Sequence, residues 1–426
     1  MDVGEAMHAF ITEAFPICRS ITGDGVRRTL AMIAERIPLA IHEVPSGTPV
    51  FDWTVPREWN IRDAWIKDPS GRKVVDFQES SLHVLNYSVP IHARLPLADL
   101  RQHLFTLPGK PDLIPYRTSY YKEAWGFCLA HRQLEALPEG EYEVLIDSTL
   151  ADGSLTYGEC FLPGEEEREV LFSTHVCHPS LANDNLSGIA VMAWLARELV
   201  AREQRRYSYR FLFIPGTIGS ITWLARNEES AGRISHGLVA ANLGDPGSFH
   251  YKRSRRGNAE IDRIVTAVLK AAGEPFSAEE FVPFGYDERQ YCSPGFDLPV
   301  GSLTRTPWGR YPEYHTSADD LSFVQPAALA GSLSTYLKVV QVLEGNRRYL
   351  NLNPKCEPQL GRRGLYSTIG GDSGRSRELA LLWVLNLSDG YSSLLDVAER
   401  SGLGFSVIRE AADALLEAGL LREVAE

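Results

Sequence analysis

The stretch Ser173-Thr-His-Val-Cys-His-Pro-Ser-Leu-Ala-Asn-Asp-Asn-Leu-Ser-Gly188 decides the fold of this chain. An apolar run before it, Val170 to Phe172, predicts a buried strand that delivers His175 and His178 to a loop. Asp184 follows nine residues after His175, and an apolar, helix-like run begins directly after the stretch. Imidazole and carboxylate groups bind zinc, so this pattern indicates a metal site at a strand end. The alternative is a helix-capping loop rich in Asn, Asp and Ser that holds two incidental histidines.

A second stretch, Tyr311-Pro-Glu-Tyr-His-Thr-Ser-Ala-Asp-Asp320, offers another histidine flanked by carboxylates. A lone histidine there is most often structural. Paired with the first loop, His315 becomes the natural third ligand. His178 could also reach the site. Cys177, which lies between the two histidines of the first loop, is either a further ligand or a small buried side chain.

The length and composition of the chain limit the possible number of domains and classes of function. A chain of 426 residues predicts two to three domains. The net charge of −12 disfavours a nucleic-acid partner, and no window is apolar enough to predict a membrane span. The first residues lack a basic region and a signal-peptide core, and the 6 cysteines show no pairing rhythm. These features predict a cytoplasmic protein with reduced thiols.

Strands and helices alternate from residue 153 to 350. The apolar runs predict strands at 170–173, 209–214 and 237–243, and helices at 189–202, 221–226 and 259–272. Residues 1–43, with two helical patterns between residues 4 and 37, belong to the same domain. This alternation predicts a three-layer α/β domain whose active site lies at the carboxyl ends of its strands.

The sequence pattern changes between residues 44 and 152. Turns built from Pro and Gly separate short segments rich in β-formers, at Lys73–Phe77, Leu82–Val89 and Tyr142–Ile146. This pattern predicts an inserted all-β domain.

Residues 365–426 form a further unit. Helical patterns at 377–387, 392–401 and 406–418, followed by a short strand, are typical of a winged helix. Residues 376–426 hold four Arg and no Lys against nine Asp and Glu. Because a DNA-reading unit would be basic, we expect a packing or dimerisation role, and hence a homodimer.

His175, the run Ala182-Asn-Asp-Asn-Leu-Ser-Gly188 and Glu313-Tyr-His315 resemble the co-catalytic zinc aminopeptidase superfamily. The chain more closely resembles a bacterial aminopeptidase-like family that has an inserted β domain and a C-terminal winged helix. The motifs Pro115-Tyr-Arg-Thr-Ser-Tyr-Tyr121 and Phe284-Gly-Tyr-Asp-Glu-Arg289 carry that closer likeness. The resemblance implies a three-layer α/β zinc-peptidase-like domain, a β-sandwich-like inserted module and a winged-helix domain.

The resemblance also implies one or two zinc ions. Its ligands would be His175, the bridging Asp184, Asp245 and the distal His315. In the wider superfamily the peptide bond after the bridging aspartate is often cis, so the resemblance implies a cis bond between Asp184 and Asn185.

The chain departs from the superfamily in its general base. Phe213-Ile-Pro-Gly-Thr-Ile-Gly-Ser220 holds no carboxylate, and Gly216 stands where the closer family is expected to have a Glu. A positioned base adds about 10² to 10⁴-fold to the rate, so another carboxylate must serve. Asp287, Glu288 and Glu313 are the candidates. The alternative for the first two is a surface turn that they form with Arg289.

Several residues could hold a substrate. Arg253 and Arg255 belong to a basic cluster that either binds a substrate carboxylate or is a solvated loop. Arg289 is a further candidate, and Arg117, Tyr120 and Tyr121 could line the same pocket.

These observations predict a metal-dependent hydrolase that acts on an amide or peptide bond of a small peptide or an amide-containing metabolite. It would be aminopeptidase-like or a biosynthetic amidohydrolase. The alternative is a catalytically degenerate member that binds small molecules or acts as a scaffold, because Gly216 replaces a Glu. A DNA-binding regulator is disfavoured by the acidic C-terminal unit.

Overall fold

The computed structural model describes residues 2–366 and 372–424. The chain divides into two units, Met1–Asp262 with Pro275–Ser334, and Arg263–Glu274 with Thr335–Glu426. Within the described residues, no helix has the length and apolar character that crossing a bilayer requires.

An eight-stranded mixed sheet forms the centre of the first unit. Every residue of its strands β11 and β12 is buried. Each strand contains an apolar run, at residues 170–172 and 211–214, as expected for strands covered on two faces. The sheet runs in the order β1 (Ala40–Pro45), β10 (Ser154–Leu162), β12 (Ser208–Ile214), β11 (Glu169–His175), β13 (Ile234–Ala240), β16 (Val300–Thr304), β14 (Phe249–Lys252) and β15 (Phe276–Glu279). Strands β12, β11, β13 and β16 are parallel, so their carboxyl ends meet at one edge.

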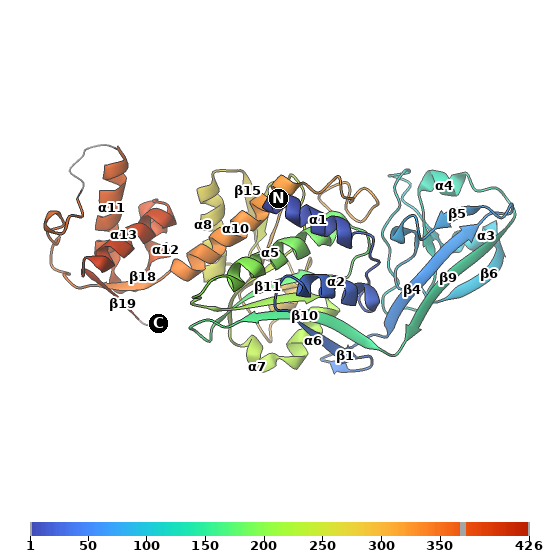
Figure 1. Ribbon diagram of the computed structural model, residues 1–426, viewed down its shortest axis with the longest axis horizontal. Coiled ribbons are helices and arrows are strands. Elements are labelled where there is room, and N and C mark those ends of the chain that lie inside the picture. Colours follow the sequence, from blue (N-terminus) through green and yellow to red (C-terminus); the bar gives the residue numbers. More distant parts are fainter. Residues whose placement is uncertain (1, 367–371, 425–426) are drawn as a thin grey trace. The chain divides into compact units, whose positions relative to one another are not determined.

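Helices cover both faces of this sheet. Helices α1 (Val3–Ala14), α2 (Asp24–Ala34) and α5 (Gly188–Val200) lie on one face, and α6 (Ile218–Arg226) and α7 (Glu228–Ala231) lie on the other (Figure 1). Helix α1 turns its apolar stripe, which includes Met7, Phe10 and Ile11, inward. The predicted three-layer α/β domain is therefore confirmed. The longer helices that follow are α8 (Glu260–Ala272) and α10 (Pro326–Gly345), and α9 (Glu288–Tyr291) is a single turn.

Two predicted strands differ from the structure. Strand β13 covers Ile234–Ala240 rather than residues 237–243, because the chain turns at Asn242, whose φ is 50°. The segment Leu82–Val89 is not a strand. It starts with the 3₁₀ turn η1 (Ser81–His83), in which the Ser80 hydroxyl accepts a hydrogen bond from the Leu82 amide.

The segment between β1 and β10 leaves and rejoins the central sheet at paired residues, Pro45 and Ser154. It contains an antiparallel four-stranded sheet in the order β5 (Lys73–Asp76), β4 (Glu58–Lys67), β9 (Glu141–Ala151) and β6 (Ile91–Pro96). It is not all-β, since it also holds helices α3 (Leu97–Leu100) and α4 (His131–Glu135) and the 3₁₀ turn η2 (Arg101–His103). Its shorter strands are β2 (Pro49–Val50), β3 (Trp53–Thr54), β7 (Leu104–Phe105) and β8 (Phe127–Cys128).

A winged-helix domain ends the chain. Its helices are α11 (Asp372–Leu387), α12 (Leu394–Ser401) and α13 (Phe405–Glu417). Its three-stranded sheet has the order β18 (Asp389–Ser393), β17 (Arg348–Asn351) and β19 (Leu421–Glu423), so it begins before the predicted boundary at residue 365. A short 3₁₀ turn, η4 (Gly361–Arg363), lies between β17 and α11. A reciprocal hydrogen-bond pair between Ser393 and Asp396 caps α12, which explains why that helix starts there.

Candidate metal centre

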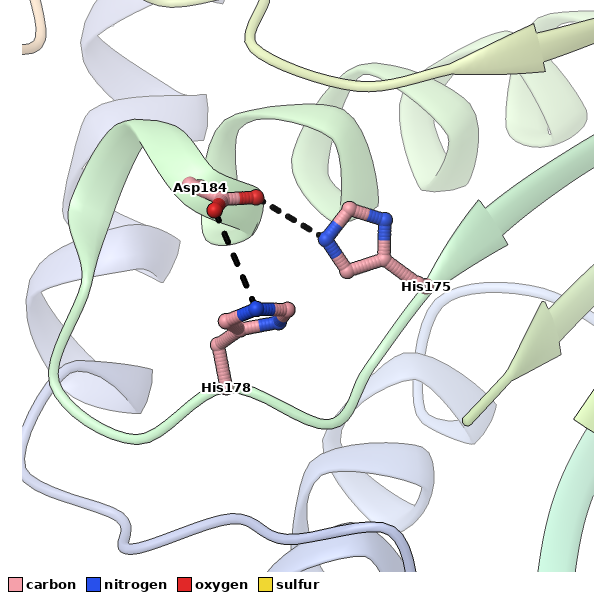
Figure 2. Close-up of side chains that lie close together, drawn as sticks. All are labelled: His175, His178 and Asp184. Atoms are coloured by element: carbon pink, nitrogen blue, oxygen red, sulfur yellow. Dashed lines mark hydrogen bonds and ion pairs between the residues drawn. The ribbon is translucent and has the colours of Figure 1, made fainter. Parts of the chain in front are cut away.

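Three imidazoles surround the carboxylate of Asp184. His175 Nε2 lies 2.9 Å from Asp184 Oδ1, and His315 Nε2 lies 3.0 Å from Oδ2. His178 Nε2 approaches the same Oδ2 to 3.8 Å. Figure 2 shows His175 and His178 facing the carboxylate from two sides. Apart from His315, which is half-buried, the side chains are largely inaccessible, and that of Asp184 is 1% exposed.

One of these groups lies at a strand end and the others in loops or turns. His175 is the last residue of β11, and His178 follows in the loop. Asp184 lies in η3 (Ala182–Ser187), a turn whose backbone is non-helical at Asp184 and Asn185 and which runs into α5. The peptide bond between Asp184 and Asn185 is cis, as the resemblance implied.

Asp319 holds the Asp184 turn in place. Its carboxylate accepts hydrogen bonds from the backbone amides of Asn183 at 2.6 Å and of Asp184 at 3.0 Å. Its carbonyl oxygen accepts a third from the amide of Ala182. Burial raises the pKa of Asp319 to about 8, against the opposing effect of these amides. Asp319 therefore orients the turn that presents Asp184.

The segment between β1 and β10 holds the third imidazole. The amide of Tyr116 donates to the carbonyl oxygen of His315 at 2.8 Å, and the amide of Ser317 donates to that of Ile114 at 2.9 Å. The Tyr116 ring then packs against two imidazoles, with centroid distances of 5.0 Å to His178 and 4.9 Å to His315. This segment therefore contributes one wall of the site.

Electrostatics favour an ionised Asp184 and a neutral His178. Burial opposes ionisation of Asp184, but its interactions with the surrounding imidazoles hold its pKa well below the usual value. Burial lowers the pKa of His178 to about 3, which keeps that ring neutral at physiological pH. Metal binding requires both of these protonation states.

The residues present fit a metal ion. Asp184 Oδ2 and His315 Nε2 approach each other to 3.0 Å, yet neither makes a hydrogen bond of acceptable geometry with any described residue. Buried polar atoms are rarely left in this state, because each costs about 1–3 kcal/mol. Imidazole nitrogen and carboxylate oxygen together form a donor set that suits zinc. His175, His178 and Asp184 bring one ligand atom each to within 4.8 Å of one another.

The structure does not bring the predicted ligand Asp245 into this cluster. Its carboxylate accepts hydrogen bonds from the Thr306 hydroxyl at 2.6 Å and the Gly247 amide at 2.8 Å. A third, from the Asn183 side chain, is 3.2 Å long. Asp245 thus braces two loops. Asn242, three residues earlier, has a buried side-chain oxygen that meets no hydrogen-bond donor among the described residues.

Position 216 leaves space beside the cluster. A Cβ on Gly216 would lie 3.4 Å from Cys177 Sγ and 3.7 Å from His175 Cβ, both ordinary van der Waals distances. Cys177 Sγ accepts a hydrogen bond from the Gly216 amide and lies 3.5 Å from His178 Nδ1. Burial raises the pKa of the Cys177 thiol to about 12, so it stays protonated. These contacts favour the interpretation of Cys177 as a small buried side chain.

The three predicted base candidates differ in position. One Asp287 oxygen accepts hydrogen bonds from the Thr217 amide and the Ser220 hydroxyl, directly beside position 216. Burial raises the pKa of both Asp287 and Glu288, but Glu288 forms a buried ion pair with Lys252. The alternative of a surface turn is wrong, because both carboxylates are buried. Glu313 is half-buried, and its carboxylate contacts none of the cluster residues in the described part of the chain.

The predicted substrate-binding residues also differ in their partners and in their distance from the site. Arg255 pairs with Asp297 and Arg253 with Glu280, which favours the solvated-loop interpretation of the basic cluster. Arg289 lies closer to the site and donates to the Thr217 hydroxyl at 3.2 Å.

The aromatic side chains of the Pro115–Tyr121 motif differ in exposure. The hydroxyls of Tyr120 and Tyr116 are 2.9 Å apart, so Tyr120 lies next to the wall of the site. Tyr121 and Arg117 are exposed.

Sequence reasoning assigned no role to Arg19, Tyr116, Tyr286 or Asp319. Arg19 is buried and donates from Nε to the His178 carbonyl oxygen at 2.8 Å. The Tyr286 ring stacks on His175, with centroids 5.8 Å apart. Only Asp319 carried a usable signal, since it lies four residues after His315 in the same polar stretch. The other contacts depend on tertiary structure.

The fold and the site together define a peptidase-like protein. Helices cover both faces of a mixed sheet, and a histidine–carboxylate cluster lies at the edge where the parallel strands end. The chain belongs to the family described as "Domain of unknown function (DUF4910)", whose model matches residues 8–346. A second family model, described as a winged helix-turn-helix, matches residues 347–423.

Two similar proteins come from Clostridium acetobutylicum. One, assigned as a polysaccharide biosynthesis protein with an aminopeptidase-like domain, is 54% identical over 424 residues, which cover 99% of this chain and 97% of the relative. The other is a crystal structure assigned as a peptidase, with 53% identity and a TM-score of 0.94 over 99% of this chain and 96% of that one. These similarities confirm the aminopeptidase-like resemblance.

More distant structures share the fold. A peptidase M28 precursor from Shewanella amazonensis has a TM-score of 0.58 at 13% identity, covering 81% of this chain and 93% of its own. A zinc aminopeptidase from Bacillus subtilis has a TM-score of 0.57 at 13% identity, covering 80% and 94%. At this identity the likeness shows the fold alone.

Proposed function

We propose that this protein is a metal-dependent hydrolase that cleaves an amide or peptide bond, with zinc as its metal. The observation that carries the proposal is the buried carboxylate of Asp184, which His175 approaches from the end of β11 to 2.9 Å and His315 approaches from a separate turn to 3.0 Å. The peptidase-like relatives and fold support the same reaction class.

A bound zinc ion would polarise the scissile carbonyl and activate a water molecule as the nucleophile. The chain's own residues would hold and orient it: His175 and Asp184 on one side, His315 on the other. Asp319 would keep the Asp184 turn in position, and the neutral state of His178 leaves a ring nitrogen free to bind. The donor set therefore supports this role.

Asp287 is the candidate base that the geometry supports best. It lies beside the empty position at Gly216, it is buried, and its raised pKa brings proton uptake closer to neutral pH. Glu288 is less suited because Lys252 engages its carboxylate. Asp287 also caps the start of α6, so its replacement has a structural cost as well.

The relative assigned to polysaccharide biosynthesis supports a proposal for the substrate class. We propose a small amide-bearing precursor, such as an N-acylated sugar derivative, alongside short peptides. The cysteines of the described chain are free thiols, which supports the expectation of a cytoplasmic enzyme. The homodimer stays a prediction for the winged-helix domain.

Hydrolysis after reconstitution with metal tests the proposal. Purified full-length protein, stripped with chelator and reloaded with zinc, should release amine from N-acyl amino sugars or aminoacyl amides, and chelation should abolish that release. Asp287→Asn should lower the rate by about 10² to 10⁴-fold without loss of bound metal. Zinc uptake with no hydrolysis of either substrate class would favour the binding or scaffolding alternative that Gly216 suggests.

A further inference from the structure

We propose that His178 is a metal ligand, which completes a site with Asp184 Oδ2 and His315 Nε2. The superfamily pattern assigns no ligand to this position, so the inference adds a residue to the centre. It rests on the metal dependence in the proposed function but does not require hydrolysis.

The ligand atoms have the separations that one ion demands. Tetrahedral zinc with bonds of about 2.0–2.1 Å places its ligand atoms about 3.3 Å apart. The distances from Asp184 Oδ2, 3.0 Å to His315 and 3.8 Å to His178, lie on either side of that value. The two rings have centroids 5.3 Å apart, and the Nε2 atom of each faces the same carboxylate oxygen.

Hydrogen bonding does not explain where His178 lies. Its Nε2 is too far from Asp184 for a hydrogen bond, and its Nδ1 meets only the Cys177 sulfur, a weak partner, among the described residues. A buried imidazole normally finds a stronger partner. A metal ion at Nε2 would supply that partner, and it would also satisfy Asp184 Oδ2 and His315 Nε2.

The backbone at His178 is fixed by a buried cation. Arg19 is 1% exposed and donates from Nε to the His178 carbonyl oxygen at 2.8 Å. A second donor, Arg19 Nη1, binds the Ala14 carbonyl oxygen at 2.8 Å. A buried guanidinium is costly, so its use at this loop indicates a conformation that the fold specifies rather than an incidental one. The Tyr116 ring packs against the His178 imidazole, with centroids 5.0 Å apart.

His178 also compensates for the glycine at position 216. Gly216 supplies no carboxylate to the metal centre, and its amide instead binds Cys177 Sγ at 3.2 Å. The same sulfur contacts His178 Nδ1. The loop thus presents an imidazole in the neighbourhood where position 216 offers no ligand.

Metal affinity tests the assignment without reference to activity. Full-length wild-type protein and His178→Ala are stripped of metal and titrated with zinc against a chromophoric chelator, and then with cobalt to record the ligand-field bands. We expect His178→Ala to bind zinc more than about 100-fold more weakly, since outer-shell changes alone cost about 10 to 100-fold. We also expect altered cobalt bands. A smaller loss of affinity overturns the assignment.

Two controls keep this result interpretable. His42→Ala removes another histidine that pairs with a carboxylate, at 3.1 Å from Glu159, and should leave the affinity unchanged. His178→Asn covers the case in which His178→Ala fails to fold, and thermal unfolding of the metal-free proteins identifies that case. Wild-type binding that His178→Asn and His178→Ala both retain overturns the His178 assignment alone. Wild-type protein that takes up neither metal overturns the proposed function as well.

Discussion

Strand β11 carries a buried charged cluster at each end, and the two clusters differ in how their polar atoms are satisfied. At the start, Glu169 is 0% exposed and accepts two hydrogen bonds from Arg210, at 2.6 and 3.0 Å. Arg233 adds a third at 3.0 Å. At the other end, His175 meets Asp184, whose second oxygen has no hydrogen bond with any described residue.

This difference distinguishes a buried charged cluster that stabilises the fold from one that binds a ligand. The Glu169 cluster is a closed network, in which a carboxylate and a planar guanidinium match each other. In the Asp184 cluster, His175 satisfies one carboxylate oxygen, but Asp184 Oδ2 and His315 Nε2 have no hydrogen bond of acceptable geometry among the described residues. A buried group that folding leaves without a partner indicates a ligand.

Removal of Asp184 should have the largest effect on metal binding. Asp184→Ala takes away the only carboxylate that all three imidazoles face, so we expect zinc affinity to fall by more than about 100-fold, beyond the effect of outer-shell changes. Competition with a chromophoric chelator measures the loss. Zinc affinity that survives in Asp184→Ala would mean that this cluster is not the metal centre.

The start of β11 should respond in the opposite way. Glu169→Gln leaves Arg210 buried with an incomplete partner, and breaking such a pair costs about 3–5 kcal/mol. We expect a loss of that size in the free energy of unfolding, measured with denaturant, and unchanged zinc content per folded chain. If Glu169→Gln lost metal while it remained stable, the two ends would not be independent.

Asp319 should have an intermediate effect on the metal centre. Asp319→Ala frees the amides of Asn183 and Asp184, so we expect zinc affinity to fall by about 10 to 100-fold, the range for residues that orient a ligand. Asp320→Ala is the matched control, because that neighbour's carboxylate only binds Ser322 and Phe323 within its own turn. Equal losses in both variants would point to a general disturbance of the loop.

The central domain could be predicted because its signals are local. Strands β11 and β12 are buried throughout, and strand ends in a parallel sheet meet at one edge, so His175 was expected at the site. Asp245 follows the same rule in sequence but not in space. The turn at Asn242 directs its carboxylate to Thr306 and Gly247 instead.

Contacts between distant segments could not be predicted. Arg19 reaches the carbonyl oxygen of His178 across 159 residues, and nothing in the Arg19 neighbourhood marks it as part of a site. Tyr116 was part of a recognised motif, yet its contacts with His178 and His315 depend on how the β1–β10 segment folds back. The prediction of a strand at residues 82–89 was wrong for a similar reason. The β-forming residues of this segment are buried in an irregular turn that side chains stabilise.

The smallest expected effect comes from adding the carboxylate that position 216 lacks. Gly216→Glu meets no close contact at Cβ, and its side chain would extend past Cys177 and His175. We expect zinc affinity to rise by up to about tenfold, or about 1.4 kcal/mol, because the centre gains an oxygen donor. Chelator competition again gives the measurement.

Gly216→Gln is the matched control for that gain, since it adds a similar volume without a charge. The two substitutions should differ, because a carboxylate is a stronger zinc ligand than a carboxamide. In a His178→Ala background, Gly216→Glu should raise the affinity more than it does alone, since the new carboxylate would then supply a donor that the centre has lost. Equal gains in both backgrounds would show that positions 178 and 216 act independently, and the compensation inferred from the Cys177 contacts would be wrong.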